Sequence, residues 1–223
     1  MTEILTPLMN IGQYFIALLK GVPISLAVTV SAFLVGAILG IPLVLMRRSQ
    51  YWLPRTLARV YIDVIRGIPP VVWLFIIFFG VGSSIIAFTP TQAAFLGMGM
   101  ISAGYLAEIY RGGFLAIPPG QTLASVALGL TRIDTLRFVL APQVLRVSLP
   151  AMATYFISLL KDTTVASTIG VRDVMMLVTQ QAQAAGGGFG PFIAAAVIYI
   201  LLSIPVAAFA RVMDAKLRQR VSR

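Results

Sequence analysis

Two long stretches without any charged side chain constrain this chain more than any other feature. Residues 22–46 carry no charge before Arg47, and residues 67–107 carry none before Glu108. Because a helix needs about 20 mostly apolar residues to cross a hydrocarbon core of about 30 Å, the first stretch suits one crossing and the second is too long for one. Hydrophobic residues make up 59% of the chain and charged residues only 11%, against about a quarter in soluble domains. The sequence therefore predicts an all-α membrane protein with several spans.

Turn-forming residues divide the apolar sequence into five predicted spans. The polar stretches 83–84 and 89–91 split the longest apolar segment into a hairpin of two helices. Pro69 and Pro70 fall inside the second span, where they should kink or unwind the helix. The five spans are expected at about residues 22–46, 59–82, 91–109, 147–168 and 188–211.

Positive charges orient these spans. Most of the 17 Lys and Arg residues fall in the first linker, in the loop 110–146 and at the C-terminal end. By the positive-inside rule these three segments face the cytoplasm, which makes residues 214–223 a basic cytoplasmic tail and places the N-terminus outside. Residues 1–21 lack the positive region of a cleavable signal, so they are predicted as an exterior interfacial helix. Residues 169–187 are expected to form a re-entrant or exterior segment.

Composition argues against several classes of function. The sequence has no His and no Cys, which removes imidazole bases, thiolate nucleophiles and the usual soft-metal ligands, so neither a metal site nor an intramembrane enzyme is expected. The net charge of +10 would suggest nucleic-acid binding in a soluble chain, but here the charges flank apolar spans without an accompanying aromatic stripe. No G-x-x-x-x-G-K-[ST] motif occurs, so the chain has no phosphate loop of the usual kind for ATP.

Small residues recur within the predicted spans at spacings that allow close helix packing. They include Gly36, Gly40, Gly97, Gly99, Ala103 and Gly104. Such packing can join two helices of one chain or two membrane subunits, and the sequence leaves both open.

The loop 110–146 carries charges throughout and has no stretch long enough to cross a membrane. Pro118 and Pro119 interrupt the chain and allow a new helix to begin. One face of this helix is apolar: Leu123, Val126, Ala127 and Leu130. A second short helix is expected from Ile133, ended by Pro142. A short, partly apolar helix suits docking into a groove of a partner, although an ordinary connection between two spans gives the same pattern.

The spacing of this loop resembles the signature loop of the membrane subunits of ATP-binding-cassette (ABC) importers. That signature reads Glu-Ala-Ala, three residues, Gly, nine residues, Ile, one residue and Leu-Pro. The matching positions in this sequence are Leu123, Ala124, Ser125, Gly129, Val139, Ala141 and Pro142. The segments AEIYRGGFLAIPPGQ, LAPQVLR and RGIPP further resemble the polar amino-acid branch of the family, which includes histidine, glutamine and arginine permeases.

The resemblance implies the fold and the partners of a type I ABC importer permease. Residues 22–213 would form one permease domain in the inner membrane of a bacterium, with 110–146 as its cytoplasmic coupling-helix loop. Two cytosolic ATPase subunits would bind ATP and magnesium and dock on that loop, while this chain would bind no cofactor itself. A second identical or homologous permease subunit would complete the translocation path, and an external solute-binding protein would deliver a polar amino acid.

The alternative reading is an unpowered channel or an ion-coupled carrier for small polar solutes. Such a protein needs buried acidic residues or broken-helix ion sites within its own chain. Only Asp162 clearly lies in an apolar surround, which argues against ion coupling.

The sequence departs from the family pattern at two places. Leu123 stands where the signature has its Glu and Ser125 where it has its second Ala, so the carboxylate thought to help dock the ATPase is missing. In the amino-acid branch an Asn-Glu pair often precedes a Lys-Asp-Thr triplet, and Thr154 and Tyr155 occupy that pair here. We therefore expect that this subunit either lacks a substrate site or binds a less cationic ligand than its relatives.

Charged residues inside spans are costly unless they are paired or hydrated, so they mark candidate functional positions. Lys161 and Asp162 are adjacent and must face different partners on a helix, and Arg66 is a candidate partner of Asp162. These charges form either a structural ion pair or a polar lining of the translocation path. The candidate path residues are Arg66, Thr154, Tyr155, Ser158, Lys161 and Asp162.

Overall fold

The computed structural model describes residues 11–82 and 87–221, with side chains up to Ala215. Every regular element in this part of the chain is a helix. In chain order the elements are α2 (Ile11–Leu19), α3 (Val22–Arg47), α4 (Trp52–Gly67), α5 (Pro70–Phe75), η1 (Ile76–Val81), α7 (Pro90–Leu115), α8 (Pro119–Ala127), α9 (Arg132–Asp134), η2 (Thr135–Leu140), α10 (Ala141–Asp162), η3 (Thr163–Ile169), α11 (Val174–Ala184) and α12 (Gly190–Val221). Four helical stretches are long and apolar enough to cross a membrane, and the bent pair formed by α4 and α5–η1 makes a fifth. The prediction of an all-α protein with five spans is confirmed.

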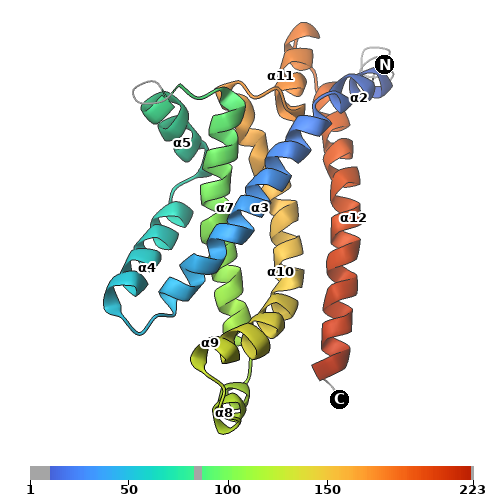
Figure 1. Cartoon of the computed structure of the whole chain (residues 1–223). Coiled ribbons are helices and arrows are strands. Elements are labelled where there is room, and N and C mark those ends of the chain that lie inside the picture. Colours follow the sequence, from blue (N-terminus) through green and yellow to red (C-terminus); the bar gives the residue numbers. More distant parts are fainter. Residues whose placement is uncertain (1–10, 83–86, 222–223) are drawn as a thin grey trace.

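Close packing of α3 against α7 forms the most extensive contact between two helices (Figure 1). A Cβ atom on Gly36 would collide with Ser102, and one on Gly40 would lie 3.1 Å from the backbone nitrogen of Ala107. The two backbones therefore approach each other because these positions have no side chain. The small residues predicted to allow close packing do so here between two helices of one chain.

The second span is broken near its middle. α4 and the α5–η1 segment meet at an angle of 103°. Ile68 is extended, the conformation favoured before a proline, and Pro69 has no N–H to continue the helix. Trp73 Nε1 donates a hydrogen bond to the Ile65 carbonyl at 3.3 Å, across the break. The predicted disruption at the prolines is confirmed, but the helix begins at Trp52, earlier than expected, because the polar stretch before the apolar run is also helical.

The fourth span begins much earlier than predicted. α9, η2, α10 and η3 form one helical stretch, Arg132–Ile169, so the prediction that Pro142 ends a separate short helix is wrong. Ala141 N–H donates to the Leu136 carbonyl, five residues back, in a wider π-turn. Pro142 follows in the first turn of α10, where its missing N–H costs little. α7 likewise continues to Leu115, so the loop between the third and fourth spans is shorter than 110–146.

The two ends of the bundle carry different elements. α2 and α11 lie at one end, and α8 and the end of α12 lie at the other (Figure 1). The segment predicted as exterior or re-entrant contains the short helix α11. α12 runs to Val221, so most of the predicted tail 214–223 continues a helix. Residues 1–10 of the predicted interfacial helix and 222–223 of the tail lie outside the described residues.

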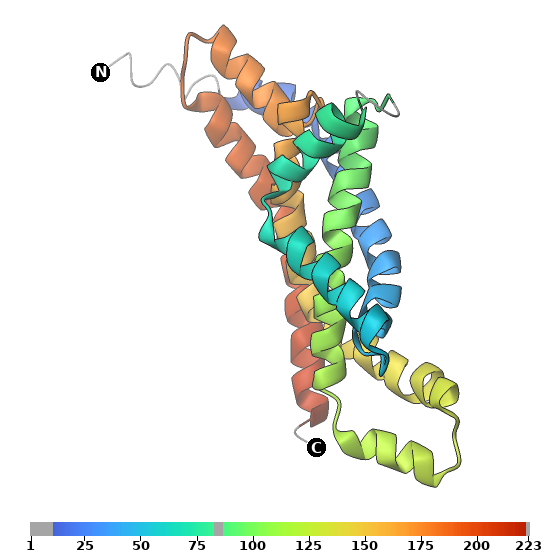
Figure 2. The ribbon, with the colours of Figure 1, turned by 90° about the vertical axis from the view of Figure 1, so that its left-hand side faces the viewer.

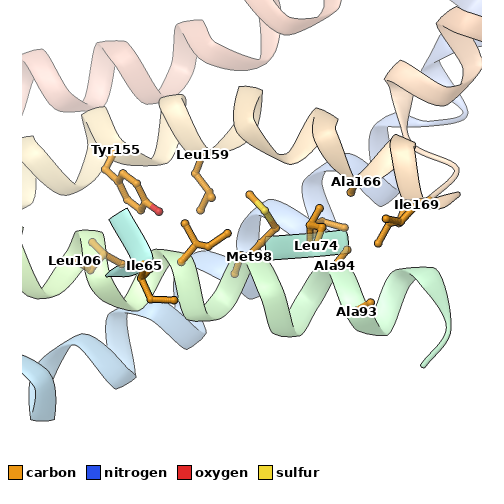
Figure 3. Close-up of a cluster of buried hydrophobic side chains, with 14 of the residues drawn as sticks. Ile65, Leu74, Ala93, Ala94, Met98, Leu106, Tyr155, Leu159, Ala166 and Ile169 are labelled. Atoms are coloured by element: carbon orange, nitrogen blue, oxygen red, sulfur yellow. The ribbon is translucent and has the colours of Figure 1, made fainter. Parts of the chain in front are cut away.

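The main hydrophobic core lies where α4, α5, α7, α10 and η3 meet (Figure 3). Its buried side chains include Ile65, Leu74, Met98, Leu106, Tyr155, Leu159 and Ile169. A smaller cluster joins α2, α11 and α12 through Leu18, Val178 and Ile198. By contrast, large side chains along the outer faces of α3 and α12 are exposed, as expected for helices that face lipid.

Candidate functional site

The helix α8 is capped at both ends. Pro119 occupies its first turn, where a missing N–H has no cost. At the other end Gly129 has a φ of +74°, and its N–H donates to the Val126 carbonyl at 2.9 Å while Leu130 N–H donates to the Ser125 carbonyl at 3.0 Å. These two bonds form a Schellman motif, which needs a residue in the left-handed region. Gly129 therefore sets the turn that ends α8.

Four large apolar side chains on and after α8 are strongly exposed. The exposed fractions are 70% for Leu123, 66% for Val126, 79% for Leu128 and 75% for Ile133. α8 projects from the end of the bundle beyond the spans (Figure 2). Exposed apolar groups on a short helix and on the turns that follow it mark an interaction surface. We refer to these four residues as the α8 surface.

One side-chain hydrogen bond joins α8 to the following helical stretch, and further bonds fix the side chains on either side of it. The Gln143 side-chain amide donates to Gln121 Oε1 at 3.2 Å and to the Val139 carbonyl at 2.8 Å. Ser125 is buried, and its hydroxyl donates to the Gln121 carbonyl at 2.8 Å. Of the other predicted loop residues, Leu123, Ala124, Gly129 and Pro142 are exposed and Val139 is half-buried. The structure therefore joins α8 directly to the start of the fourth span.

A second polar cluster lies between α10, α7 and α4. The Tyr155 hydroxyl donates to Ser102 Oγ at 3.0 Å, and the Tyr155 ring stacks on Tyr105 with ring centroids 5.2 Å apart. The guanidinium carbon of Arg66 lies 5.1 Å from the centroid of the Tyr105 ring. Two predicted path residues, Tyr155 and Arg66, thus converge on Tyr105, a residue that the sequence analysis did not single out.

Among the described residues, the other candidate path residues form no hydrogen bond or ion pair with this cluster. Thr154 is exposed, and its hydroxyl donates to the Pro150 carbonyl one turn back at 3.0 Å. Ser158 is half-buried, and Lys161 and Asp162 are exposed at the end of α10. The side chains of Thr154, Lys161 and Asp162 are therefore accessible to a partner or a solute.

Glu108 lies close to arginines from α3, α4 and α7. The sequence analysis did not identify it as a site residue. Arg111 Nε and Nη2 both lie 2.9 Å from Glu108 Oε2. Arg47 Nε lies 3.0 Å from Oε1, although the alignment of this contact is too poor for a hydrogen bond, so the pair is held by charge. Arg66 Nη1 lies 3.9 Å from Oε2. The hypothesis that Arg66 pairs with Asp162 is wrong, because the break in the second span leaves the end of α4 beside α7.

One signal in the sequence could have identified Glu108. It is the acid that ends the longest charge-free stretch, and Arg111 follows one helical turn later. Its other partners come from distant parts of the chain and are visible only in the fold. Among the residues that the structure describes, no group of three acidic side chains is placed to hold a metal ion.

Comparison with known proteins agrees with this arrangement. Residues 32–219 match the family described as binding-protein-dependent transport system inner membrane component. The chain is 31% identical over 193 residues to the probable amino-acid permease protein YxeN of Bacillus subtilis (strain 168), covering 85% of this chain and 86% of that protein. It is 33% identical over 203 residues to the arginine transport system permease protein ArtQ of the same organism, covering 90% and 92%.

Solved structures share the fold. The crystal structure of an amino acid ABC transporter with histidines matches with a TM-score of 0.86 and 28% identity, over 93% of this chain and 97% of that chain. Inward-facing conformations of the MetNI methionine ABC transporter match with a TM-score of 0.76 and 21% identity, over 89% and 95%. With its five spans, its projecting α8 and these matches, the chain belongs to the family of binding-protein-dependent transport system inner membrane components.

Proposed function

We propose that this chain is the permease subunit of an ATP-driven importer for polar amino acids, and that a separate ATPase docks on its α8 surface. The observation that carries this proposal is the combination of an exposed apolar helix with a direct hydrogen bond between that helix and the fourth span. The substrate class is supported by relatives that are themselves named as amino-acid and arginine permeases. The ATP and magnesium sites would belong to the partner, since this sequence has no phosphate-loop motif.

The α8 surface would transmit movement of the ATPase to the spans. Gln143 bonds α8 to the stretch Arg132–Ile169, which is helical throughout. A displacement of α8 would therefore move the start of this stretch with it. The π-turn at η2 lies near the start of this stretch, just before Gln143, and such turns are frequent at functional sites. ATP would favour one state of the permease through its different contacts with the two states.

The remaining partners and the orientation follow from the same proposal. The end of the bundle that carries α8 would face the cytoplasm, in line with the basic residues of the first linker and of the loop. The end with α2 and α11 would face an external solute-binding protein. A second permease subunit, identical or homologous, would complete the path, as symmetric pairs commonly do.

The cluster of Tyr155, Tyr105 and Arg66 is our candidate for this subunit's part of the path. Arg66 is 41% exposed and offers a positive charge over an aromatic ring, which suits a substrate carboxylate. Thr154, Ser158, Lys161 and Asp162 supply further polar groups from α10. No carboxylate stands at Tyr155, so this half of the path would bind a cationic side chain less well than relatives that have one there.

An ion-coupled carrier would need an acidic side chain that is free to bind the coupling ion, and Glu108, the half-buried acid beside Arg66, is not free. Glu108 is surrounded by Arg47, Arg66 and Arg111. A carboxylate whose charge is already balanced by three guanidinium groups offers little to a transported cation.

Copurification of ATPase activity tests the proposal. The full chain is expressed with its native partners and purified in mild detergent, and ATPase activity is assayed in the eluate. Val126→Asp places a charge on the α8 surface and should abolish most of the activity, because burying an unpaired carboxylate at an interface is costly. Phe189→Asp is the matched control: it changes an 83% exposed apolar residue just before α12, far from α8, and should leave the activity intact.

Two results would contradict docking at α8. One is an equal loss of ATPase activity in both variants, and the other is full retention in the Val126→Asp variant. An absence of ATPase from the native, folded chain would weaken the powered importer itself and would call for flux measurements in liposomes.

A further inference from the structure

An apolar groove lies between the end of α3, the end of α7 and the start of the fourth span. Its walls include Ile41, Leu45, Tyr110, Phe114, Leu136 and Val144. Its volume is about 210 Å³, smaller than the roughly 300–1,000 Å³ of pockets that hold drug-sized ligands. The Tyr110 hydroxyl donates a hydrogen bond to the Ala37 carbonyl of α3 at 3.2 Å, so its proton is not available to a ligand in the groove. The groove therefore suits a hydrocarbon chain and offers little to a polar solute.

The groove opens toward the side of the protein that faces lipid. Ile41 is 51% exposed and Leu45 is 38% exposed on α3, and Leu145 on α10 is 50% exposed at the same groove. Ile41 and Leu45 belong to the apolar helix α3, which is long enough to span a membrane, so acyl chains would border this side of the groove. A lipid tail can enter without crossing a polar barrier.

Two arginines close to the end of α3 have no ion-pair partner among the described residues, and each is linked to an element that lines the groove. The guanidinium carbon of Arg48 lies 4.1 Å from the centroid of the Phe114 ring, which is part of the groove wall. Arg132 lies one helical turn before Leu136, and its Nη1 donates to Gln50 Oε1 at 3.3 Å, next to the end of α3. Partial burial lowers the pKa of Arg48 because its charge has lost hydration. Arg47, by contrast, is already paired with Glu108.

We propose that this groove binds one acyl chain of an anionic phospholipid, whose phosphate is held by Arg48 and Arg132. α3 ends at Arg47, so both guanidinium groups lie at the level where the apolar span gives way to headgroups. Guanidinium groups bind phosphate oxygens through charge-assisted hydrogen bonds. Two unpaired cations at this level favour a lipid with net negative charge over a zwitterionic one. The site borders the α8 surface at Arg132, next to Ile133, and does not depend on the transported solute.

Native mass spectrometry of the full chain in detergent tests this site. The protein is titrated with phosphatidylglycerol, and in parallel with phosphatidylcholine as the zwitterionic lipid. One phosphatidylglycerol should remain bound preferentially, and preference should fall roughly fivefold for each arginine removed in Arg48→Gln and Arg132→Gln. Arg55→Gln is the matched control: it removes the same charge from an exposed position on α4 and should leave the preference unchanged.

A groove-filling variant separates tail binding from attraction of the headgroup alone. Ala141 lines the groove and is exposed, so Ala141→Phe should fill it and reduce binding of phosphatidylglycerol while both arginines remain. Leu145→Trp serves the same purpose if the first variant does not fold. Equal retention of the two lipids, an equal effect of Arg55→Gln, or unchanged binding in the filled variants would overturn the proposal.

A second copy of this chain is the competing occupant of the groove. The sequence contains no Cys, so Leu145→Cys introduces a single thiol at the groove. Under oxidising conditions in anionic liposomes the variant should stay monomeric on a non-reducing gel. A disulfide-linked dimer would show that the groove faces another copy and would overturn the lipid assignment.

Discussion

Tyr155 on α10 donates a hydrogen bond to Ser102 on α7 at 3.0 Å, and both side chains are buried. Ser102 is also the residue against which Gly36 of α3 packs. Three of the five spans therefore meet at one small polar contact inside an apolar core. This contact links the packing of the bundle to the aromatic cluster that we propose as part of the translocation path.

Loss of the Tyr155 hydroxyl should destabilise the protein modestly. Tyr155→Phe leaves Ser102 Oγ without this partner in the core, and such interhelical bonds in membrane proteins contribute about 0.6 kcal/mol on average and up to about 1.7. The double variant Tyr155→Phe/Ser102→Ala should recover part of the loss because no unpaired hydroxyl remains. Unfolding in detergent monitored by circular dichroism checks this, and additive effects of the two substitutions would contradict a direct bond.

Close approach of α3 and α7 should make Gly36 intolerant of even one methyl group. Gly36→Ala would force the helices apart at Ser102, with a cost of about 1–3 kcal/mol, as for other overpacked sites. Gly112→Ala in α7 is the control, since nothing lies within 4 Å of its added Cβ, and it should be neutral or stabilising by up to about 1 kcal/mol. Thermal unfolding should rank the native protein between the two variants.

Removal of the Glu108 charge should destabilise the junction of α3, α4 and α7. Glu108→Gln leaves Arg47 and Arg111 close together without a counter-charge. Breaking buried pairs in this way costs about 3–5 kcal/mol, and less is expected here because the site is partly exposed. Glu108→Gln/Arg47→Gln should regain part of the stability. Equal unfolding temperatures for native protein and Glu108→Gln would show that the cluster contributes nothing.

Asp173 should make stability depend on pH between about 4 and 6. Burial raises the pKa of the Asp173 carboxyl to about 6, despite the hydrogen bond from Met176 N–H at 2.8 Å. The folded state therefore holds its proton more tightly than the unfolded state, and stability falls as pH rises through this window. Asp173→Asn keeps an N-cap but cannot ionise, so its unfolding temperature should exceed that of the native protein at pH 7.5 and change less between pH 4 and 6.

The control for this pH effect is Asp173→Ala, which cannot ionise either and should lie about 1 kcal/mol below Asp173→Asn at every pH because the cap of α11 is gone. A native protein whose unfolding temperature rises from pH 4 to pH 6, after subtraction of the Asp173→Asn curve, would contradict the sign.

Several features of the candidate site could be predicted from local sequence. Gly129 could be placed at the end of α8 because its spacing follows the apolar face of that helix, and Pro69 predicted the break in the second span because proline lacks an N–H. The course of the chain at Pro142 could not be predicted in this way. Proline lacks one N–H donor but need not end a helix, and Pro42 and Pro150 also lie inside continuous helices. At Pro142 the chain continues because a π-turn precedes it and the proline occupies the first turn of α10.

The sequence by itself predicted five membrane crossings. The length of each apolar segment and the charges that flank it are local properties, and they determine insertion into a bilayer without reference to the rest of the fold. Its helical spacing also determined where α8 exposes Leu123 and Val126. Only the tertiary structure decided that Arg66 lies beside Tyr105 and Glu108, that Arg48 packs on Phe114, and that Arg132 bonds to Gln50. Those pairings join residues far apart in the chain, and the energy of a contact depends on the backbone positions that packing of all the spans sets together.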